Sequence, residues 1–297
     1  MQVYRCPVCQ SDIGTPHLVK EMFLGTREQF AYFECADCGC LSRAEGPGNF
    51  DRYLAQDDTP AKRGPLSVRG KLEVALHLSS FFSFLADGRR RPDLEILRRV
   101  HFRKSMSLLD VGSGPGNLVG DLRELGYKAH GIDPDIFSDV RDGFGVRVEC
   151  KALAEVTEAF DVILFRHSLE RLPVDTLKQA RERISENGCC IACIALLGWA
   201  WRTYSTDWAQ LNLPRNHLLH SIKSFSLLAE KSGFRIEKVV FDSTEFQFWA
   251  SDSLQRDIPL HEMPEPNRAQ RARMRRVVEA LNLQQQGDTA QFYLKPI

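Results

Sequence analysis

The sequence predicts an α/β fold built on a doubly wound, mostly parallel sheet, with a small cysteine-containing segment ahead of it. Two observations carry this prediction. From Ser107 onward, compact apolar runs alternate with amphipathic segments, as expected for parallel strands that crossover helices bury on both faces. Before that point, residues 1–43 hold two CxxC pairs on short extended segments and few large apolar side chains.

Length and composition narrow the class of protein further. The chain has 297 residues, of which 43% are apolar, so it can bury a substantial core. Its 39 basic and 39 acidic side chains cancel, which argues against a nucleic-acid partner. The longest apolar run, from Cys189, covers 13 residues and is too short to span a membrane. The N-terminus lacks the pattern of an export signal, so we expect a cytoplasmic protein whose nine cysteines are thiols.

The chain divides into three parts. We predict a metal-stabilised segment at 1–43, a polar linker rich in glycine and proline at 44–64, and one α/β domain at 65–297. The domain opens with two expected helices, 66–86 and 91–100, the second with proline in its first turn. Apolar residues recur at helical spacing in the first of them: Leu72, Ala75, Leu76, Phe82 and Leu85.

The remaining elements follow in regular order. Compact apolar runs predict strands at 107–112, 129–133, 160–165 and 189–196. Amphipathic segments that end on a glycine predict helices at 117–126, 175–188 and 221–233. Two further strands are expected at 234–242 and 289–296, separated by a basic run from Arg268 that we interpret as a solvated helix face.

A glycine-rich turn follows the first of these strands. Gly112, Gly114 and Gly116 stand between strand and helix, where open sheets bind ligands. A dinucleotide turn would require glycine or alanine at position 117, where Asn117 stands. A triphosphate loop would end in Gly-Lys-Ser/Thr, and no such triplet follows.

Two carboxylates indicate what the turn holds. Asp110 precedes the first glycine by two residues, where it would repel a pyrophosphate and attract an ammonium or sulfonium group. Asp133 ends the next strand, where an acidic side chain can accept hydrogen bonds from ribose hydroxyls. A ribose together with a cation describes S-adenosylmethionine.

With these motifs the sequence resembles the class I S-adenosylmethionine-dependent methyltransferases. Four segments carry the resemblance: "LLDVGSGPG", "GIDPD", "FDVILFRHSLERL" and "ISENGCCIACIAL". It implies a Rossmann-like sheet of seven strands, with Asp110 and the glycines on the methionine part and Asp133 on the ribose. Ala152 and Leu153 would flank the adenine. The full predicted cofactor site is Asp110, Gly112, Ser113, Gly114, Gly116, Asp133, Pro134, Ala152, Leu153 and Arg166. Arg171 departs from the family, which has histidine there.

The two cysteine pairs predict a metal site. Cys6 with Cys9, and Cys35 with Cys38, form two CxxC turns that can present four thiolates to a structural Zn²⁺. A redox pair or disulfides are the weaker readings in a chain without an export signal. Cys40 breaks the spacing and is treated as a spare thiol. The other cysteines are expected in the core: Cys150, Cys189, Cys190 and Cys193.

Methyl transfer requires a base near the methyl group. His167 follows the fourth-motif strand at the mouth of the predicted crevice, and Glu170 nearby is expected to cap or to pair with an arginine. After the next strand, the Trp- and Tyr-rich insert 199–234 is predicted to cover the acceptor. The insert resembles that of a bacterial methyltransferase group with an N-terminal zinc ribbon, associated with surface-polysaccharide biosynthesis. On that resemblance His217 is the preferred base and His167 the second candidate.

The leading functional hypothesis is therefore O-methylation of a sugar, glycan or other small molecule. A zinc ribbon ahead of this fold also resembles certain ribosomal RNA base methyltransferases, although those would be basic. A third hypothesis is a non-catalytic zinc-ribbon scaffold with a relic cofactor site, which Arg171 favours and the intact Asp110 opposes. The sequence predicts neither the acceptor's identity nor the oligomeric state.

Overall fold

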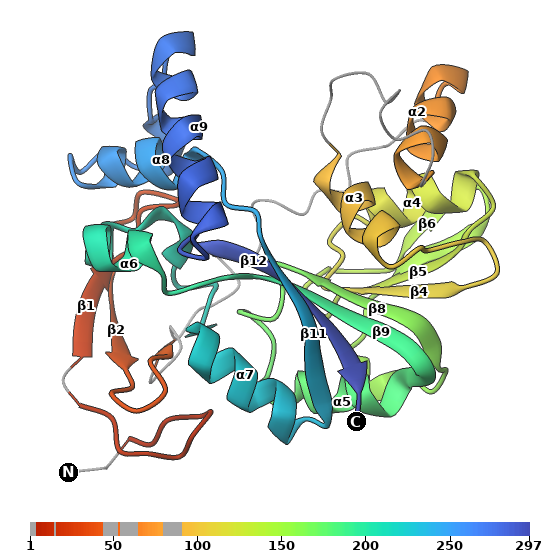
Figure 1. Cartoon of the computed structure of the whole chain (residues 1–297), viewed down its shortest axis with the longest axis horizontal. Coiled ribbons are helices and arrows are strands. Elements are labelled where there is room, and N and C mark those ends of the chain that lie inside the picture. The colour runs from red at the N-terminus through yellow and green to blue at the C-terminus, as the bar shows by residue number, and fades with distance from the viewer. Residues whose placement is uncertain (1–3, 15, 44–52, 54–64, 80–90) are drawn as a thin grey trace.

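The computed structural model describes residues 4–14, 16–43, 53, 65–79 and 91–297 (Figure 1). Its largest sheet has the order β11-β12-β9-β8-β4-β5-β7-β6. Five strands are parallel: β4 (Ser107–Val111), β5 (Lys128–Ile132), β7 (Gly145–Glu149), β8 (Phe160–Arg166) and β9 (Ile184–Ala195). Antiparallel strands complete the two edges: β6 (Val140–Asp142), β11 (Phe234–Phe241) and β12 (Thr289–Pro296). The predicted Rossmann-like fold is confirmed, with the short β6 as an additional strand at one edge.

Helices cover both faces of this sheet. One face packs against α2 (Val68–Leu78), α3 (Pro92–Arg99) and α4 (Asn117–Glu124) through a core that includes Leu97, Leu118 and Val162. The other face packs against α5 (Thr176–Arg183) and α7 (Ile222–Lys231) through a second core with Leu177 and Phe225. Because helices bury the strands from both sides, the strands carry the continuous apolar runs seen in the sequence.

The N-terminal segment forms a separate small sheet. It contains β1 (Pro16–Lys20), β2 (Gln29–Glu34) and β3 (Leu41–Arg43), and β10 (Leu218–Leu219) adds to it next to β3. Side chains of the insert also bind the cysteine loops, since the Ser221 hydroxyl donates to the Cys38 carbonyl at 2.6 Å. The insert, which follows β9 of the large sheet, thus ties the N-terminal segment to that sheet. Apart from residue 53, the predicted linker 44–64 lies outside the described residues.

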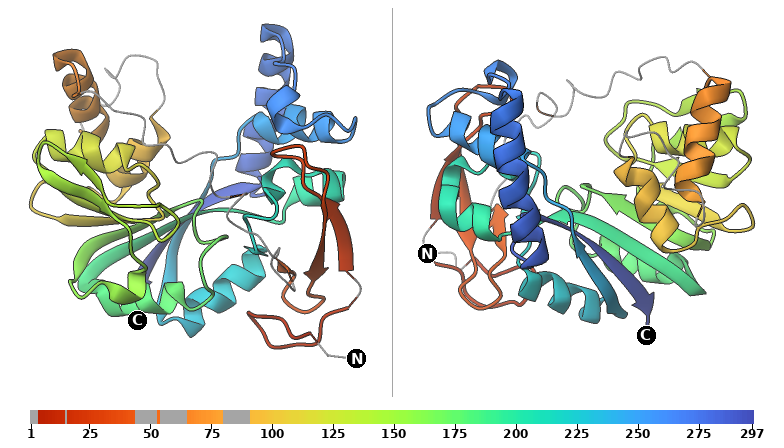
Figure 2. Two further views of the ribbon diagram at one scale, coloured as in Figure 1. Left: turned by 180° about the vertical axis from the view of Figure 1, so that it is seen from behind. Right: turned by 45° about the horizontal axis from the view of Figure 1, so that its top comes forward.

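The insert and the C-terminal helices pack around this small sheet (Figure 2). The insert continues from β9 into α6 (Trp199–Tyr204) and the short turns η3 (Ser205–Asp207) and η4 (Ala209–Leu211). Between β11 and β12 lie α8 (Phe246–Leu254), η5 (Leu260–Glu262) and α9 (Arg268–Leu283). A third apolar core joins these elements to β2 and β3 and includes Tyr32, Leu41, Trp201, Trp208 and Val278. None of the helices in the described part of the chain is long and apolar enough to cross a membrane.

Most predicted elements are confirmed, and three predictions are wrong. The helix expected at 175–188 ends at Arg183, and Gly188 lies inside β9, where a Cβ would approach the Asp161 carbonyl oxygen to 2.9 Å. That glycine permits close packing of two strands and does not cap a helix. The apolar residues noted at helical spacing do not mark the buried side of α2, since Leu72 is 59% exposed while Val74 and Leu78 face the core. The rest of the predicted helix, with Phe82 and Leu85, falls in residues 80–90, which lie outside the described residues.

The third wrong prediction concerns Cys150. It was expected in the core but is exposed, since it follows β7 in the loop before the short helix η2 (Leu153–Glu155). The strand β7 itself was not predicted, because its short sequence "GVRVE" carries no long apolar run. Cys189, Cys190 and Cys193 are buried in β9 as predicted.

Candidate active site

The glycine turn joins β4 to α4 and is held in a conformation that requires glycine. Gly112, Gly114 and Gly116 all have left-handed backbones, with φ of +71°, +54° and +68°. A Cβ at Gly112 would lie 2.4 Å from the Ser168 Cβ, and one at Gly116 would lie 2.3 Å from the Val148 Cγ2. The backbone therefore passes close to β7 and to the loop after β8, so a side chain at either glycine would clash with its neighbour.

Asp110 lies directly beneath this turn and is completely buried. Neither of its carboxylate oxygens accepts a hydrogen bond from a described residue. Its nearest counter-charge is the Arg166 guanidinium, whose Nη2 lies 3.5 Å from Oδ2. Burial raises the pKa of Asp110, and the positive charge of Arg166 opposes that shift. A buried carboxylate without hydrogen-bond donors suits a cationic ligand that brings its own.

Asp133 is also buried, but its oxygens have backbone partners. Oδ2 accepts from the Gly114 amide at 2.8 Å, and Oδ1 accepts from the Asp135 amide at 2.9 Å. In this structure Asp133 therefore fixes the shape of the glycine turn, and each oxygen keeps a second lone pair for a ligand hydroxyl. Ser113 in the turn is buried, and its hydroxyl has no partner among the described residues.

The other predicted cofactor residues gather at the same edge of the sheet. Pro134 is exposed directly after Asp133 at the end of β5. Ala152 and Leu153 follow β7, the strand next to β5, and Leu153 is buried. Arg166 is the last residue of β8, on the other side of β4. The structure thus brings the predicted residues to the carboxyl ends of four neighbouring strands, where open α/β sheets bind ligands.

A cavity of about 580 Å³ opens beside Arg166. Elements from distant parts of the chain form it, and the residues that line it are Pro92, Asp93, Ile96, Arg166, His167, Cys193, Gln210, Asp242, Thr244 and Thr289. Most of these side chains can form hydrogen bonds, and the described lining contains no Phe, Tyr or Trp. The cavity therefore suits a polar molecule with several hydrogen-bonding groups.

His167 lines this cavity and has a carboxylate behind it. Its Nδ1 lies 3.9 Å from the Oε1 of Glu170, and its backbone is left-handed, with φ of +52°. Glu170 is buried, and the same Oε1 accepts a hydrogen bond from the Ala195 amide at 2.7 Å. Glu170 therefore caps the end of β9 and faces a histidine, whereas an arginine was the charged partner expected from the sequence.

His217, the preferred base from the sequence, does not line the cavity. It lies between the N-terminal sheet and the loop after β8, where its amide donates to the Glu170 carbonyl and its carbonyl accepts from the Arg43 amide. Burial and the positive charge of Arg43 lower the pKa of His217. His220 is buried deeper and packs against Ser224, and burial lowers its pKa to about 3. Both histidines are positioned to support the insert.

The aromatic side chains of the insert do not line the cavity either. Trp201, Tyr204 and Trp208 are buried in the core shared with β2 and β3. Trp208 donates its indole N–H to the buried Asp288 carboxylate at 3.1 Å. The insert folds against the N-terminal sheet, and of its residues Gln210 lines the cavity. That these rings cover the acceptor stays a prediction that this cavity does not support.

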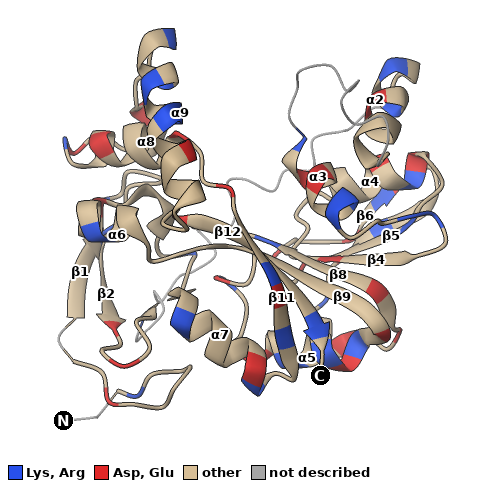
Figure 3. Ribbon diagram, viewed as in Figure 1, with Lys and Arg blue, Asp and Glu red and all other residues tan. Residues whose placement is uncertain are grey.

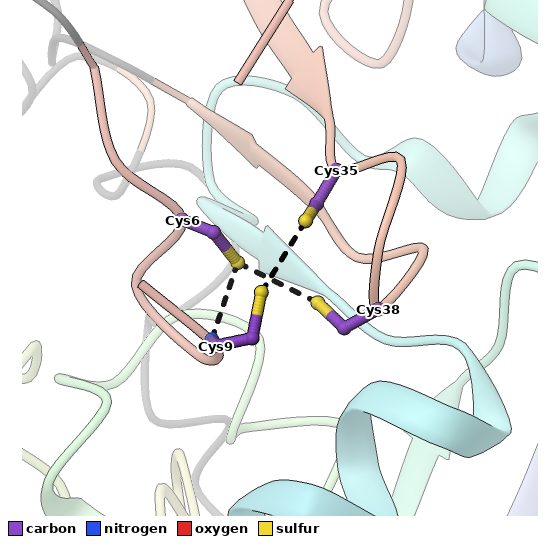
Figure 4. Close-up of side chains that lie close together, drawn as sticks. All are labelled: Cys6, Cys9, Cys35 and Cys38. Atoms are coloured by element: carbon purple, nitrogen blue, oxygen red, sulfur yellow. Dashed lines mark hydrogen bonds between the residues drawn. The ribbon is translucent and has the colours of Figure 1, made fainter. Parts of the chain in front are cut away.

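The four predicted metal ligands lie together (Figure 4). The sulfur atoms of Cys6, Cys9, Cys35 and Cys38 all lie within 4.8 Å of one another. None of the four is in a disulfide, and the Cys9 and Cys35 sulfurs are 3.4 Å apart. The fifth cysteine of the segment, Cys40, is buried with its sulfur 3.3 Å from that of Cys6.

Comparison with known proteins agrees with this architecture. Residues 84–239, more than half of the chain, match the model of a family described as a methyltransferase domain. The chain belongs to this methyltransferase family. None of the curated proteins compared with the methyltransferase matches it.

Solved structures with a similar fold include several methyltransferases. One is a S-adenosylmethionine-dependent methyltransferase from Archaeoglobus fulgidus, with 15% identity and a TM-score of 0.43, covering 74% of this chain and 100% of that one. Another is a possible histamine N-methyltransferase from Thermotoga maritima, with 16% identity and a TM-score of 0.44, covering 83% and 97%. A third is an O-methyltransferase of a Brevibacillus brevis multienzyme, with 12% identity and a TM-score of 0.41, covering 69% and 76%.

Several cavity residues of the methyltransferase were not predicted. Asp242 and Thr244 follow β11, and Thr289 opens β12, so the antiparallel pair brings them to the edge where the parallel strands end. Asp93 lies in the first turn of α3 and also lines the cavity. The sequence could have indicated them by their position, because each of these polar residues stands next to or at one terminus of a strand or helix.

Proposed function

We propose that this methyltransferase transfers a methyl group from S-adenosylmethionine to a hydroxyl of a sugar, a glycan or a similar small polar molecule. The observation that carries the proposal is the cavity beside Arg166, whose described lining offers carboxylates, hydroxyls, an amide and the imidazole of His167. Polyhydroxyl molecules are recognised by such sets of hydrogen-bonding side chains.

The residues at the glycine turn fit the cofactor. Asp110 provides a buried negative charge without hydrogen-bond donors, which suits the methionine ammonium group. Asp133 keeps lone pairs for the ribose hydroxyls, and Ala152 with Leu153 would flank the adenine. When bound, S-adenosylmethionine supplies a methyl carbon that its sulfonium already activates.

His167 is the proposed base. Glu170 lies on the Nδ1 side of the imidazole, so Nε2 is the nitrogen left to take the proton of the acceptor hydroxyl. The buried Glu170 carboxylate then faces the imidazolium as its counter-charge. The structure supports His167 over His217 for this role, because His167 lines the cavity.

Cys6, Cys9, Cys35 and Cys38 are proposed to hold a structural Zn²⁺. Four thiolates at about 2.3 Å from a shared ion lie somewhat under 4 Å apart, and the observed sulfur separations of up to 4.8 Å fit after a small contraction. With four sulfur ligands the ion has no open position for catalysis. On this proposal residues 1–43 are a zinc ribbon, 44–64 a linker and 65–297 the methyltransferase domain.

Turnover with defined acceptors tests the proposal. Release of S-adenosylhomocysteine is measured for the wild type and for His167→Ala, with a panel of nucleotide sugars and oligosaccharides as acceptors and an RNA oligonucleotide as a competing class. Turnover on a carbohydrate that His167→Ala abolishes supports the proposal. Methylation of the RNA alone would replace it with a nucleic-acid methyltransferase.

A further inference from the structure

Asp242 gives the cavity beside Arg166 a carboxylate that no described cation neutralises. It follows β11 and shares the cavity wall with two other charged side chains, Asp93 and Arg166. Each of those two already faces an opposite charge. Asp93 pairs with Arg91 at 2.8 Å, and Arg166 lies 3.5 Å from the buried Asp110. Asp242, in contrast, forms no ion pair with a Lys, Arg or His in the described part of the chain.

A buried chain of hydrogen bonds holds the Asp242 carboxylate in place. The Gln291 side-chain amide donates through Nε2 to Oδ2 of Asp242 at 2.6 Å, and the Tyr293 hydroxyl donates to Oε1 of Gln291 at 2.7 Å. Gln291 and Tyr293 are both buried and stand two residues apart on β12, so they lie on the same face of the sheet. Asp242 itself is half-buried at the cavity wall. Its Oδ1 has no hydrogen-bond partner among the described residues and is left for a molecule in the cavity.

The chain next to Asp242 brings no positive charge that would neutralise it. Residues 242–245 join β11 to α8 and contain acidic but no basic side chains (Figure 3). The arginine that contacts this segment, Arg275, pairs with Glu245 at 3.1 Å. Asp242 therefore keeps its charge for a ligand.

The other carboxylates close to the cavity already have a role in the proposed reaction. Glu170 lies 3.9 Å from His167 and serves as its counter-charge. Asp110 is assigned to the methionine ammonium group. Asp242 is thus the negative charge of the described lining that neither an ion pair nor the proposed cofactor uses.

We infer that the acceptor carries an ammonium group and that Asp242 binds it, which makes an amino sugar the substrate class. An ammonium group donates a charge-assisted hydrogen bond to Oδ1 and also neutralises the partly buried carboxylate, whereas a neutral hydroxyl does only the first. The carboxylate of an acidic sugar would be repelled by Asp242. This inference rests on the proposed function and names the class of its acceptor.

The ammonium group serves recognition and is not the methylated group. Once protonated, the nitrogen has no lone pair with which to attack a methyl carbon. His167 lines the same cavity, so a hydroxyl of the molecule held by Asp242 can meet the proposed base. The hydroxyl oxygen then bonds to the methyl carbon, the carbon–sulfur bond breaks with its electron pair on sulfur, and His167 takes the hydroxyl proton.

The test measures binding of sugars to the full-length, zinc-replete protein in the presence and absence of S-adenosylhomocysteine. The ligands are glucose, its derivatives in which one hydroxyl at a time is replaced by an amine, and the neutral N-acetyl form of each derivative. Asp242→Asn is compared with Glu237→Gln, which alters an exposed carboxylate of β11 that does not line the cavity. Both variants lose one negative charge, so a difference between them reports position.

At least one amine derivative should bind the wild type and Glu237→Gln about tenfold more tightly than glucose and its own N-acetyl form, and the preference should fall to within about twofold in Asp242→Asn. The inference is overturned if no amine derivative binds the wild type more tightly than glucose, or if Asp242→Asn keeps the preference. Mass spectrometry after incubation with S-adenosylmethionine locates the methyl group, and a methyl group on the amine nitrogen would also overturn the inference. Absence of methyl transfer to every sugar, amine or neutral, would count against the proposed function, while the binding comparison would still decide the role of Asp242.

Discussion

Replacing Asp110 by asparagine removes the negative charge that we assign to the methionine ammonium group. Asp110 is fully buried, both of its oxygens lack hydrogen bonds from described residues, and its nearest described counter-charge, Arg166, is 3.5 Å away. A hydrogen bond to a charged group contributes about 1.5–3 kcal/mol. Loss of one or two such bonds weakens binding by about 2–4 kcal/mol, so we expect the Kd for S-adenosylmethionine to rise by about 30- to 1,000-fold.

Calorimetric titration of Asp110→Asn and the wild type measures this change. Asp242→Asn is the matched control, because Asp242 lines the cavity but is not assigned to the cofactor. Asparagine has nearly the same shape, and a buried carboxylate without donors destabilises the fold, so we expect the Tm of Asp110→Asn to be unchanged or higher. A well-folded Asp110→Asn protein with unchanged affinity would refute the reasoning.

Three further predictions concern the base, the metal and one buried acid. His167→Ala should lower kcat by about 100-fold or more and leave the affinity for S-adenosylmethionine unchanged. His217→Ala should lower kcat much less. If steady-state kinetics showed the larger loss of kcat in His217→Ala, His217 would be the base. Cys9→Ser should lose the zinc and have a lower Tm than the wild type. Elemental analysis should still find one zinc per chain in the control, Cys40→Ser. Zinc retained by Cys9→Ser would contradict the four-ligand site. Burial raises the pKa of Asp288 to about 6, so ionisation of this carboxyl destabilises the folded wild type as pH rises from about 4 to 6. Across that window the free energy of unfolding of Asp288→Asn, measured in urea, should rise by up to about 3 kcal/mol relative to that of the wild type. A difference between the two proteins that does not change with pH would contradict the assignment.

Features written in a short stretch of sequence were predictable. The glycine turn and Asp110 lie within seven residues of one another, so their placement depends on one strand, one turn and one helix. The cysteine pairs were equally local, because each CxxC turn orients its own two thiols and the ladder of β1 to β3 brings the turns together. In both cases the residue types themselves are specific for the local geometry.

Features that depend on distant contacts were not predictable. The pairing of β10 with β3 joins residues about 175 positions apart, and it draws His217 toward the N-terminal sheet and the aromatic rings of the insert into the core. The cavity wall made by Asp242 and Thr289 follows from the antiparallel order β11-β12-β9, which no local pattern specifies. The sequence therefore indicated the proposed cofactor half of the site, while the proposed acceptor half follows from the structure.

The most direct test of the account is titration calorimetry of the zinc-replete protein with S-adenosylmethionine and S-adenosylhomocysteine, with NAD and ATP as controls. The account predicts that both sulfur compounds bind at a single site and that neither control binds, because the glycine turn and the buried Asp110 favour a cationic ligand and disfavour a pyrophosphate. Binding of NAD or ATP would contradict the account. So would the failure of both sulfur compounds to bind, whether or not a polyhydroxyl acceptor is present.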